Sequence, residues 1–70
     1  MSAISPWTRC EPACEWARFV GTEAVAVVYL DPDEGWVWQT AHGGNRGMFS
    51  EDIAMAQADA CLKREGWTLP

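Results

Sequence analysis

The sequence has few basic side chains, with five Lys and Arg against ten Asp and Glu among 70 residues, and a formal net charge of −5. Nucleic-acid affinity comes largely from basic side chains that neutralise phosphates, so direct nucleic-acid binding is not expected. Anionic membranes are excluded as partners because like charges repel. The natural electrostatic partner of this chain is therefore a basic surface on another protein.

Long apolar runs are also absent, because no stretch of 18 apolar residues occurs, and this excludes a transmembrane helix. The first twenty residues contain no basic segment followed by an apolar one, so no secretory signal is expected and a cytoplasmic location is the default. The cysteines are Cys10, Cys14 and Cys61. In a reducing compartment these are expected to be free thiols.

Tryptophan, in contrast, is abundant. The sequence contains Trp7, Trp16, Trp36, Trp38 and Trp67. A single domain of this size buries only about 60% of the surface that its unfolded chain exposes, so a few large rings must supply most of the core. So thin a core leaves two alternatives, in which either all five rings are buried or at least one is substantially exposed.

The residue pattern predicts one α+β domain over residues 1–70, with an antiparallel sheet of about three strands and one C-terminal helix packed on one face. We expect an irregular arm at 1–14, strands within 15–42, a Gly-rich loop at 43–49, a helix at 50–65 and a tail at 66–70. The strands are expected at 15–20, 23–30 and 36–41.

Local signals support this order of elements. Residues 23–30 are rich in β-branched side chains and apolar on both faces, which predicts a central strand. The Asp-Pro-Asp-Glu-Gly segment at 31–35 predicts a turn, because proline presets φ and Gly35 tolerates positive φ. Ser50 is a good helix N-cap, and Gly66 is a good residue just beyond the helix end.

Metal binding and catalysis have weak signals. Cys10 and Cys14, with Cys61 and His42, could supply four zinc ligands, but two of these ligands are isolated in the sequence. The favoured interpretation has Cys61 in the core and incidental thiols in the arm, with a Cys10–Cys14 disulfide as a further alternative in an oxidising setting. We predict no metal or other cofactor. No recognisable pattern links His42 to a nucleophile, so the chain is predicted not to be an enzyme.

The candidate partner-binding residues are the acidic turn and the two tryptophans that follow it. They are Asp31, Asp33, Glu34, Trp36 and Trp38. The turn is either an ordinary solvated turn or an acidic patch for a basic partner, with Glu51 and Asp52 as possible neighbours. The two indoles form core if their face meets the helix, and an interface if that face is exposed.

Two resemblances add to these expectations. The segments Asp31–Trp38 and Ser50–Ala54 resemble the β-hairpin-plus-helix units of HicB-type antitoxins and YegP-like domains, across about half of the chain. This resemblance implies a hairpin followed by a capped helix. No DNA-binding segment follows, so it does not imply a repressor. Size, acidity and Trp-rich strands are similar to short phage-encoded proteins, anti-CRISPR inhibitors among them.

From the sequence we predict a non-enzymatic acidic protein-binding module, of the inhibitor type that occupies a basic nucleic-acid-binding surface of a partner protein. Two alternatives stay open. One is a homodimerising structural module that pairs through strand edges. The other is a zinc- or thiol-dependent small protein.

Overall fold

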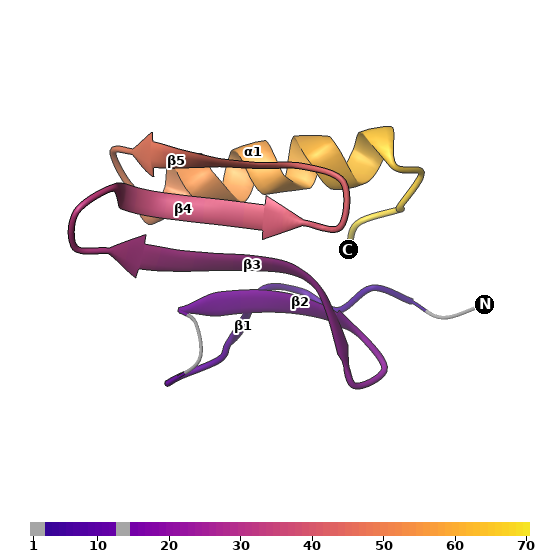
Figure 1. Ribbon diagram of the computed structural model, residues 1–70. Coiled ribbons are helices and arrows are strands. Elements are labelled where there is room, and N and C mark those ends of the chain that lie inside the picture. The colour runs from indigo at the N-terminus through magenta and orange to yellow at the C-terminus, as the bar shows by residue number, and fades with distance from the viewer. Residues whose placement is uncertain (1–2, 13–14) are drawn as a thin grey trace.

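The structure is a computed structural model that describes residues 3–12 and 15–70. Within these residues, five antiparallel strands form one sheet in chain order, and one helix packs against it (Figure 1). The elements are β1 (Thr8–Arg9), β2 (Trp16–Val20), β3 (Glu23–Asp31), β4 (Gly35–Thr40), β5 (Gly44–Met48) and α1 (Glu51–Arg64). The α+β class and the packed helix are confirmed, but the sheet has five strands, and the prediction of three was wrong.

The two additional strands lie at the edges of the sheet, in the segments expected to be an irregular arm and a Gly-rich loop. β5 reads Gly-Asn-Arg-Gly-Met and lacks the alternating branched side chains by which a strand is recognised. It pairs with β4 through its backbone. A Cβ at Gly44 would lie 3.0 Å from the carbonyl oxygen of Trp38, so the close approach depends on glycine. Because two of its five residues are glycines, β5 also has no alternating pattern from which a strand could be predicted.

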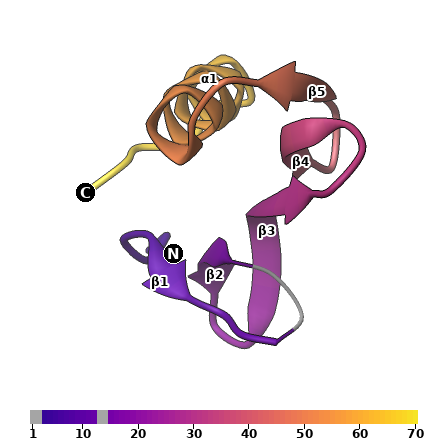
Figure 2. The ribbon, with the colours of Figure 1, turned by 90° about the vertical axis from the view of Figure 1, so that its left-hand side faces the viewer.

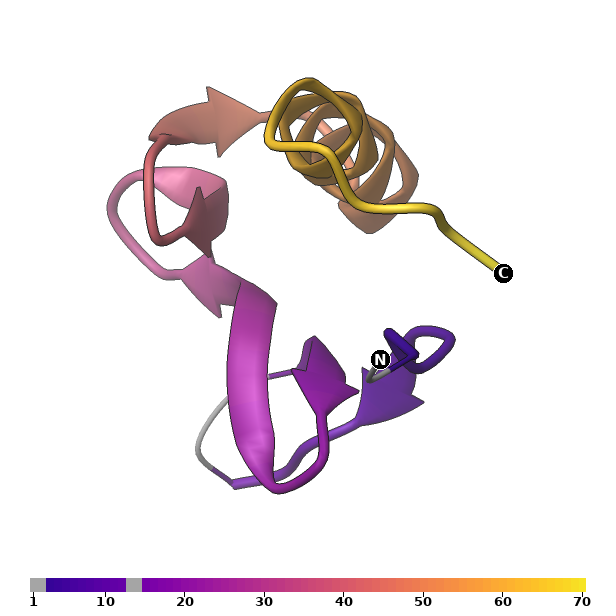
Figure 3. The same cartoon turned by 90° about the vertical axis from the view of Figure 1, so that its right-hand side faces the viewer.

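β3 is the central strand, as predicted, and pairs with β2 on one side and β4 on the other. Its Val28 lies between Trp16 and Trp38 in the register, and Val28 is fully buried. Register shifts interrupt the pairing after Arg18 and after Trp36, and irregularities of this kind increase the local twist. Figures 2 and 3 show that the sheet curls strongly, with α1 inside the curve.

The helix packs through a stripe of small residues, which helical spacing places on one face. The buried positions are Ala54, Ala58, Cys61 and Leu62. Both alanines have no exposed surface, and they belong to one core cluster with Val28 and Trp38. Small side chains let the helix axis lie close to a sheet that carries large rings. Within the described part of the chain, no helix has the length and apolarity that a membrane crossing requires.

The caps of α1 also match the prediction. The Ser50 side chain accepts the backbone N–H of Ile53 at 3.3 Å. At the other end Gly66 has a φ of +99°, which favours glycine. The Trp67 N–H donates to the Leu62 carbonyl at 3.0 Å, and the Gly66 N–H donates to a carbonyl in the last turn. This pair of bonds is a Schellman motif.

Three tryptophans from three separate segments attach the rest of the chain to α1. The indole N–H donates to a helix side chain in each case: Trp7 to Asp59 at 3.4 Å, Trp16 to Glu51 at 3.1 Å, and Trp38 to Gln57 at 3.0 Å. All five tryptophans are buried or half-buried. The alternative in which at least one ring is substantially exposed is therefore not the one found. Each of these bonds satisfies a polar group that burial would otherwise leave unpaired.

Arg18 brings a charge into the core, with only 5% of its surface exposed. Its guanidinium donates twice to the Asp59 carboxylate, at 2.9 and 3.1 Å, and once to the Ser5 carbonyl at 2.9 Å. It also lies 4.8 Å from the centroid of the Trp7 ring. β2, the N-terminal arm and α1 therefore converge on one cation.

Replacing Asp59 by Asn is expected to lower the free energy of unfolding by about 3 kcal/mol, because it leaves the buried Arg18 charge uncompensated. The matched control is Glu34→Gln, which removes the exposed partner of Arg46 and should cost at most about 1 kcal/mol. Urea unfolding followed by tryptophan fluorescence measures both. Equal losses in the two variants would contradict a structural role for the buried pair.

Candidate protein-binding site

The acidic turn between β3 and β4 is held by one of its own carboxylates. Asp31 Oδ1 accepts the backbone N–H of Asp33 at 2.8 Å and that of Glu34 at 3.1 Å. Asp33 and Glu34 are exposed, and a Glu34 oxygen lies 3.7 Å from an Arg46 nitrogen. Both side chains of that pair are about half exposed, so solvent screens the attraction. Asp31 therefore shapes the turn, and the other two acids face solvent.

A second acidic segment lies at the same end of the molecule, in the first turn of α1, where Glu51 and Asp52 suit the positive end of the helix. The turn adjoins the end of β5, because a Cβ at Gly35 would lie 3.3 Å from the Met48 carbonyl oxygen. Figure 1 shows the β3–β4 turn and the start of α1 at the same end of the molecule. We call this region the acidic end, made up of Asp31, Asp33, Glu34, Glu51 and Asp52.

The two tryptophans predicted as anchors are not on the open surface. Trp38 is 6% exposed and belongs to the core, because its face of β4 meets α1. Trp36 is half-buried and packs on the same cluster. The predicted site is therefore split. Asp33 and Glu34 are accessible, Asp31 is engaged in the turn, and Trp38 offers no binding surface.

Other apolar side chains are exposed at the acidic end. Among the described residues, the exposed large hydrophobics are Leu30 at 53%, Phe49 at 95% and Ile53 at 41%. Leu30 precedes Asp31 in β3, Phe49 joins β5 to α1, and Ile53 is in the first turn of the helix. We call these three the apolar trio. They were not among the predicted site residues.

The exposure of Phe49 is related to its position beside the helix N-cap Ser50. Phe49 directly precedes the N-cap, where an apolar side chain often packs on the fourth helical residue as a hydrophobic staple. Here that fourth residue is Ala54, which is fully buried against the sheet. The Ala54 methyl group packs on the sheet and is too small to cover the Phe49 ring, which is exposed to solvent. The staple lacks its partner, and Phe49 stays in solvent.

The opposite end of the helix has a different arrangement, in which a half-buried carboxylate accepts hydrogen bonds from two side chains. Glu65 Oε2 accepts from Thr40 Oγ1 at 2.8 Å and from Cys61 Sγ at 3.1 Å. The Cys61 hydrogen bond is the main cause of a lowered Glu65 pKa, with help from Thr40 and from the charges of His42 and Arg64, against the opposing effect of burial. The Cys61 thiol is itself buried. This cluster holds the end of α1 on the β4–β5 hairpin.

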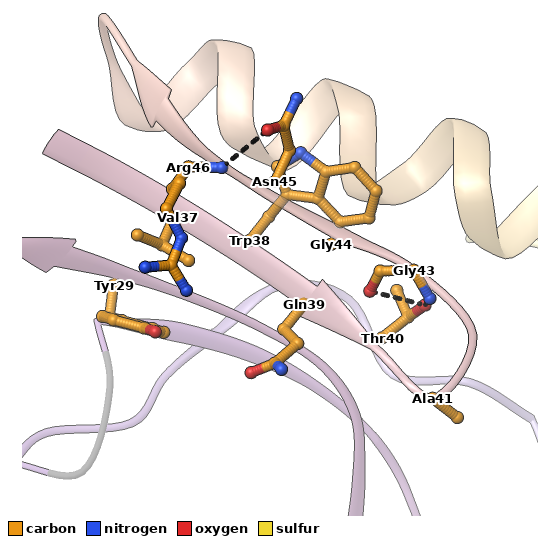
Figure 4. Close-up of a pocket in the computed structure, with 10 residues that line it drawn as sticks. All are labelled: Tyr29, Val37, Trp38, Gln39, Thr40, Ala41, Gly43, Gly44, Asn45 and Arg46. Carbon is orange, nitrogen blue, oxygen red and sulfur yellow. Dashed lines mark hydrogen bonds between the residues drawn. The ribbon is translucent and has the colours of Figure 1, made fainter. Parts of the chain in front are cut away.

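A hollow of about 460 Å³ lies over the β4–β5 hairpin (Figure 4). Tyr29 and Val37 are cross-strand partners on the face that points away from α1, and Gln39 lies on that same face. In Figure 4 the Arg46 side chain extends along this face toward Tyr29. The hollow is open, and its polar groups come mainly from amides, a phenol and one guanidinium.

The cysteines do not form a metal site in the part of the chain that is described. No group of three or more His, Cys, Asp or Glu side chains in residues 3–12 and 15–70 is placed to hold a metal ion. Cys10 is half-buried after β1, and Cys61 is buried in the core. Cys14 lies outside the described residues, so the zinc and Cys10–Cys14 disulfide alternatives stay predictions.

Comparisons with protein-family models, curated proteins and solved structures find no match to this chain. The similarity to HicB-type and YegP-like units and to phage-encoded inhibitors therefore stays a prediction. The case for function rests on the surface of the molecule itself.

The lowered pKa of Glu65 predicts a pH-dependent stability. A carboxylate whose folded-state pKa lies below its ordinary value of 4.5 stabilises the fold above that value, and this stabilisation is lost as the pH falls through the folded-state pKa. The wild type should therefore be more stable than Glu65→Gln at neutral pH, and the difference should shrink in acid. Urea unfolding of both proteins at neutral and acidic pH measures it. A difference that stays constant with pH would contradict the assignment.

Proposed function

We propose that the protein is a non-enzymatic binding module whose acidic end docks on a basic surface of another protein. The observation that carries this proposal is that two acidic segments, residues 31–34 and 51–52, are separated in sequence and lie at the same end of the molecule. Convergent charges of one sign steer association with a surface of the opposite sign. The effect is sensitive to salt, because the screening length is only about 8 Å at physiological ionic strength.

Basic side chains offset little of this charge. Arg9 is paired with two glutamates of its own segment, at 2.6 and 3.2 Å, and Arg18 is enclosed with Asp59. Lys63 and Arg64 lie in the last turn of α1, at the opposite end of the helix. Within the described residues, Arg46 is the cation that reaches the acidic end, and it does so at 3.7 Å. The acidic end therefore keeps a net negative field.

The proposed partner surface is one that ordinarily binds nucleic acid in the cytoplasm. Such surfaces concentrate Lys and Arg to neutralise phosphates, and so they are the basic patches that an acidic module meets most strongly. By occupying the patch, the module would keep nucleic acid away from it. The consequence of binding is inhibition of the partner, without any chemical step.

The test compares two charge reversals in hairpin turns. Asp33→Lys lies in the acidic end, and Glu23→Lys is an exposed control at the start of β3, directly after the β2–β3 turn, with the same change in net charge. Tagged proteins are incubated with nuclease-treated bacterial lysate at low and high salt. We expect one basic protein to be retained by the wild type and by Glu23→Lys at low salt. It should be lost at high salt and with Asp33→Lys. Equal retention by both variants, or no retained protein, would contradict the proposal.

A second candidate function is favoured by the edge of the sheet. Within residues 3–12 and 15–70, β5 is the last strand of the sheet, and its residues 44–47 are exposed, so it is an edge strand that can pair with another strand. Pairing of two such edges would give a symmetric dimer. Sedimentation velocity over a range of protein concentrations separates the two candidates. A monomer at every concentration would remove the dimer.

A further inference from the structure

We infer that the apolar trio of Leu30, Phe49 and Ile53 selects the partner, and that it binds a cationic amphipathic segment of another protein. The inference rests on the proposed function, because it assigns a partner chemistry to the acidic end. What it adds is a requirement for apolar side chains among the basic ones, which charge alone does not impose.

The first step is the location of the trio. These are the exposed large hydrophobics among the described residues, and all three lie at one end of a molecule whose other large rings are buried or half-buried. Leu30 is the register partner of Trp36, and Trp36 is in turn the partner of Met48, directly before Phe49. This row of pairings runs from Leu30 through the half-buried Trp36 and Met48 to the residue before Phe49. Exposed apolar side chains gathered at one end of a molecule indicate a contact surface.

The second step is the charge around the trio. Each member has an acid within two residues in the chain: Asp31 follows Leu30, Glu51 follows Phe49 after Ser50, and Asp52 precedes Ile53. A purely apolar partner would remove water from these carboxylates without pairing them, which is unfavourable. A purely basic partner would leave the apolar surface in water. A segment that combines both kinds of side chain satisfies both conditions.

The third step excludes two other occupants. In a symmetric dimer through this surface, the same patch of both copies would meet, so two acidic ends would face each other and repel. An anionic membrane surface would be repelled for the same reason. A cationic amphipathic helix is the simplest segment with the required chemistry, since its apolar stripe is flanked by basic side chains.

The experiment uses two synthetic peptides as probes. One is an amphipathic Leu/Lys helix, and the other is a Lys-only peptide of the same length. Titration calorimetry with the full chain should show tighter binding of the Leu/Lys peptide. Phe49→Ser is expected to weaken that binding by about tenfold, the loss of one good apolar contact, and to leave Lys-only binding unchanged. Phe49→Leu is the matched control and should keep most of the affinity. Thermal melting checks that both variants fold like the wild type.

The outcomes separate the inference from the proposed function. If Phe49→Ser binds the Leu/Lys peptide as tightly as the wild type does, the inference is overturned. The proposed function then survives if Asp33→Lys weakens binding of both peptides. If Phe49→Ser weakens binding but Asp33→Lys does not, the apolar contact stands and the electrostatic proposal fails. If the wild type binds neither peptide, both are wrong.

Discussion

The fold depends on the buried guanidinium of Arg18. A charge in so small a core is stable only when a carboxylate and further acceptors surround it, and here Asp59 and the Ser5 carbonyl provide them. Asp59 belongs to α1, so the ion pair fixes where the helix lies over the sheet. Trp7 stacks on the same cation and donates to the same carboxylate. One ion therefore determines the positions of the N-terminal arm, β2 and the helix together.

The Arg18–Asp59 pair holds the middle of α1, and the two ends of the helix are held by different contacts. At the C-terminal end, Glu65 accepts from Cys61 of the helix and from Thr40 of β4, and the Thr40 bond links this end of the helix to the β4–β5 hairpin. At the N-terminal end, Glu51 accepts one indole N–H from Trp16 and Ala54 is buried, whereas Asp52 and Ile53 are exposed. The N-terminal end is thus held by Ser50, Glu51 and Ala54, while the side chains of Asp52 and Ile53 take no part in holding it. The N-terminal end can carry exposed acids and apolar side chains without unfolding the domain.

The sequence predicts those parts of the fold that side chains specify locally. The helix between Ser50 and Gly66, its small-residue stripe, the central strand and the acidic turn all have such signals, and all are present. The edge strands are not predictable in this way, because β5 pairs through a glycine-rich backbone. The candidate site is predictable only in its charge. Burial of Trp38 depends on which sheet face meets the helix, and exposure of Phe49 depends on the small size and the burial of Ala54, the fourth residue of the helix.

The carboxylates of this chain fall into two groups, those that accept internal hydrogen bonds and those that face solvent. Four of the acids are internal acceptors that shape the turn or hold the helix: Asp31, Glu51, Asp59 and Glu65. Net charge alone therefore overstates the charge that a partner meets, and Asp33, Glu34 and Asp52 are the exposed acids at the acidic end. Three screened charges can steer an encounter, but they hold a complex weakly. A lasting complex thus needs apolar contact, and at this end of the molecule the exposed apolar surface is the trio around Phe49.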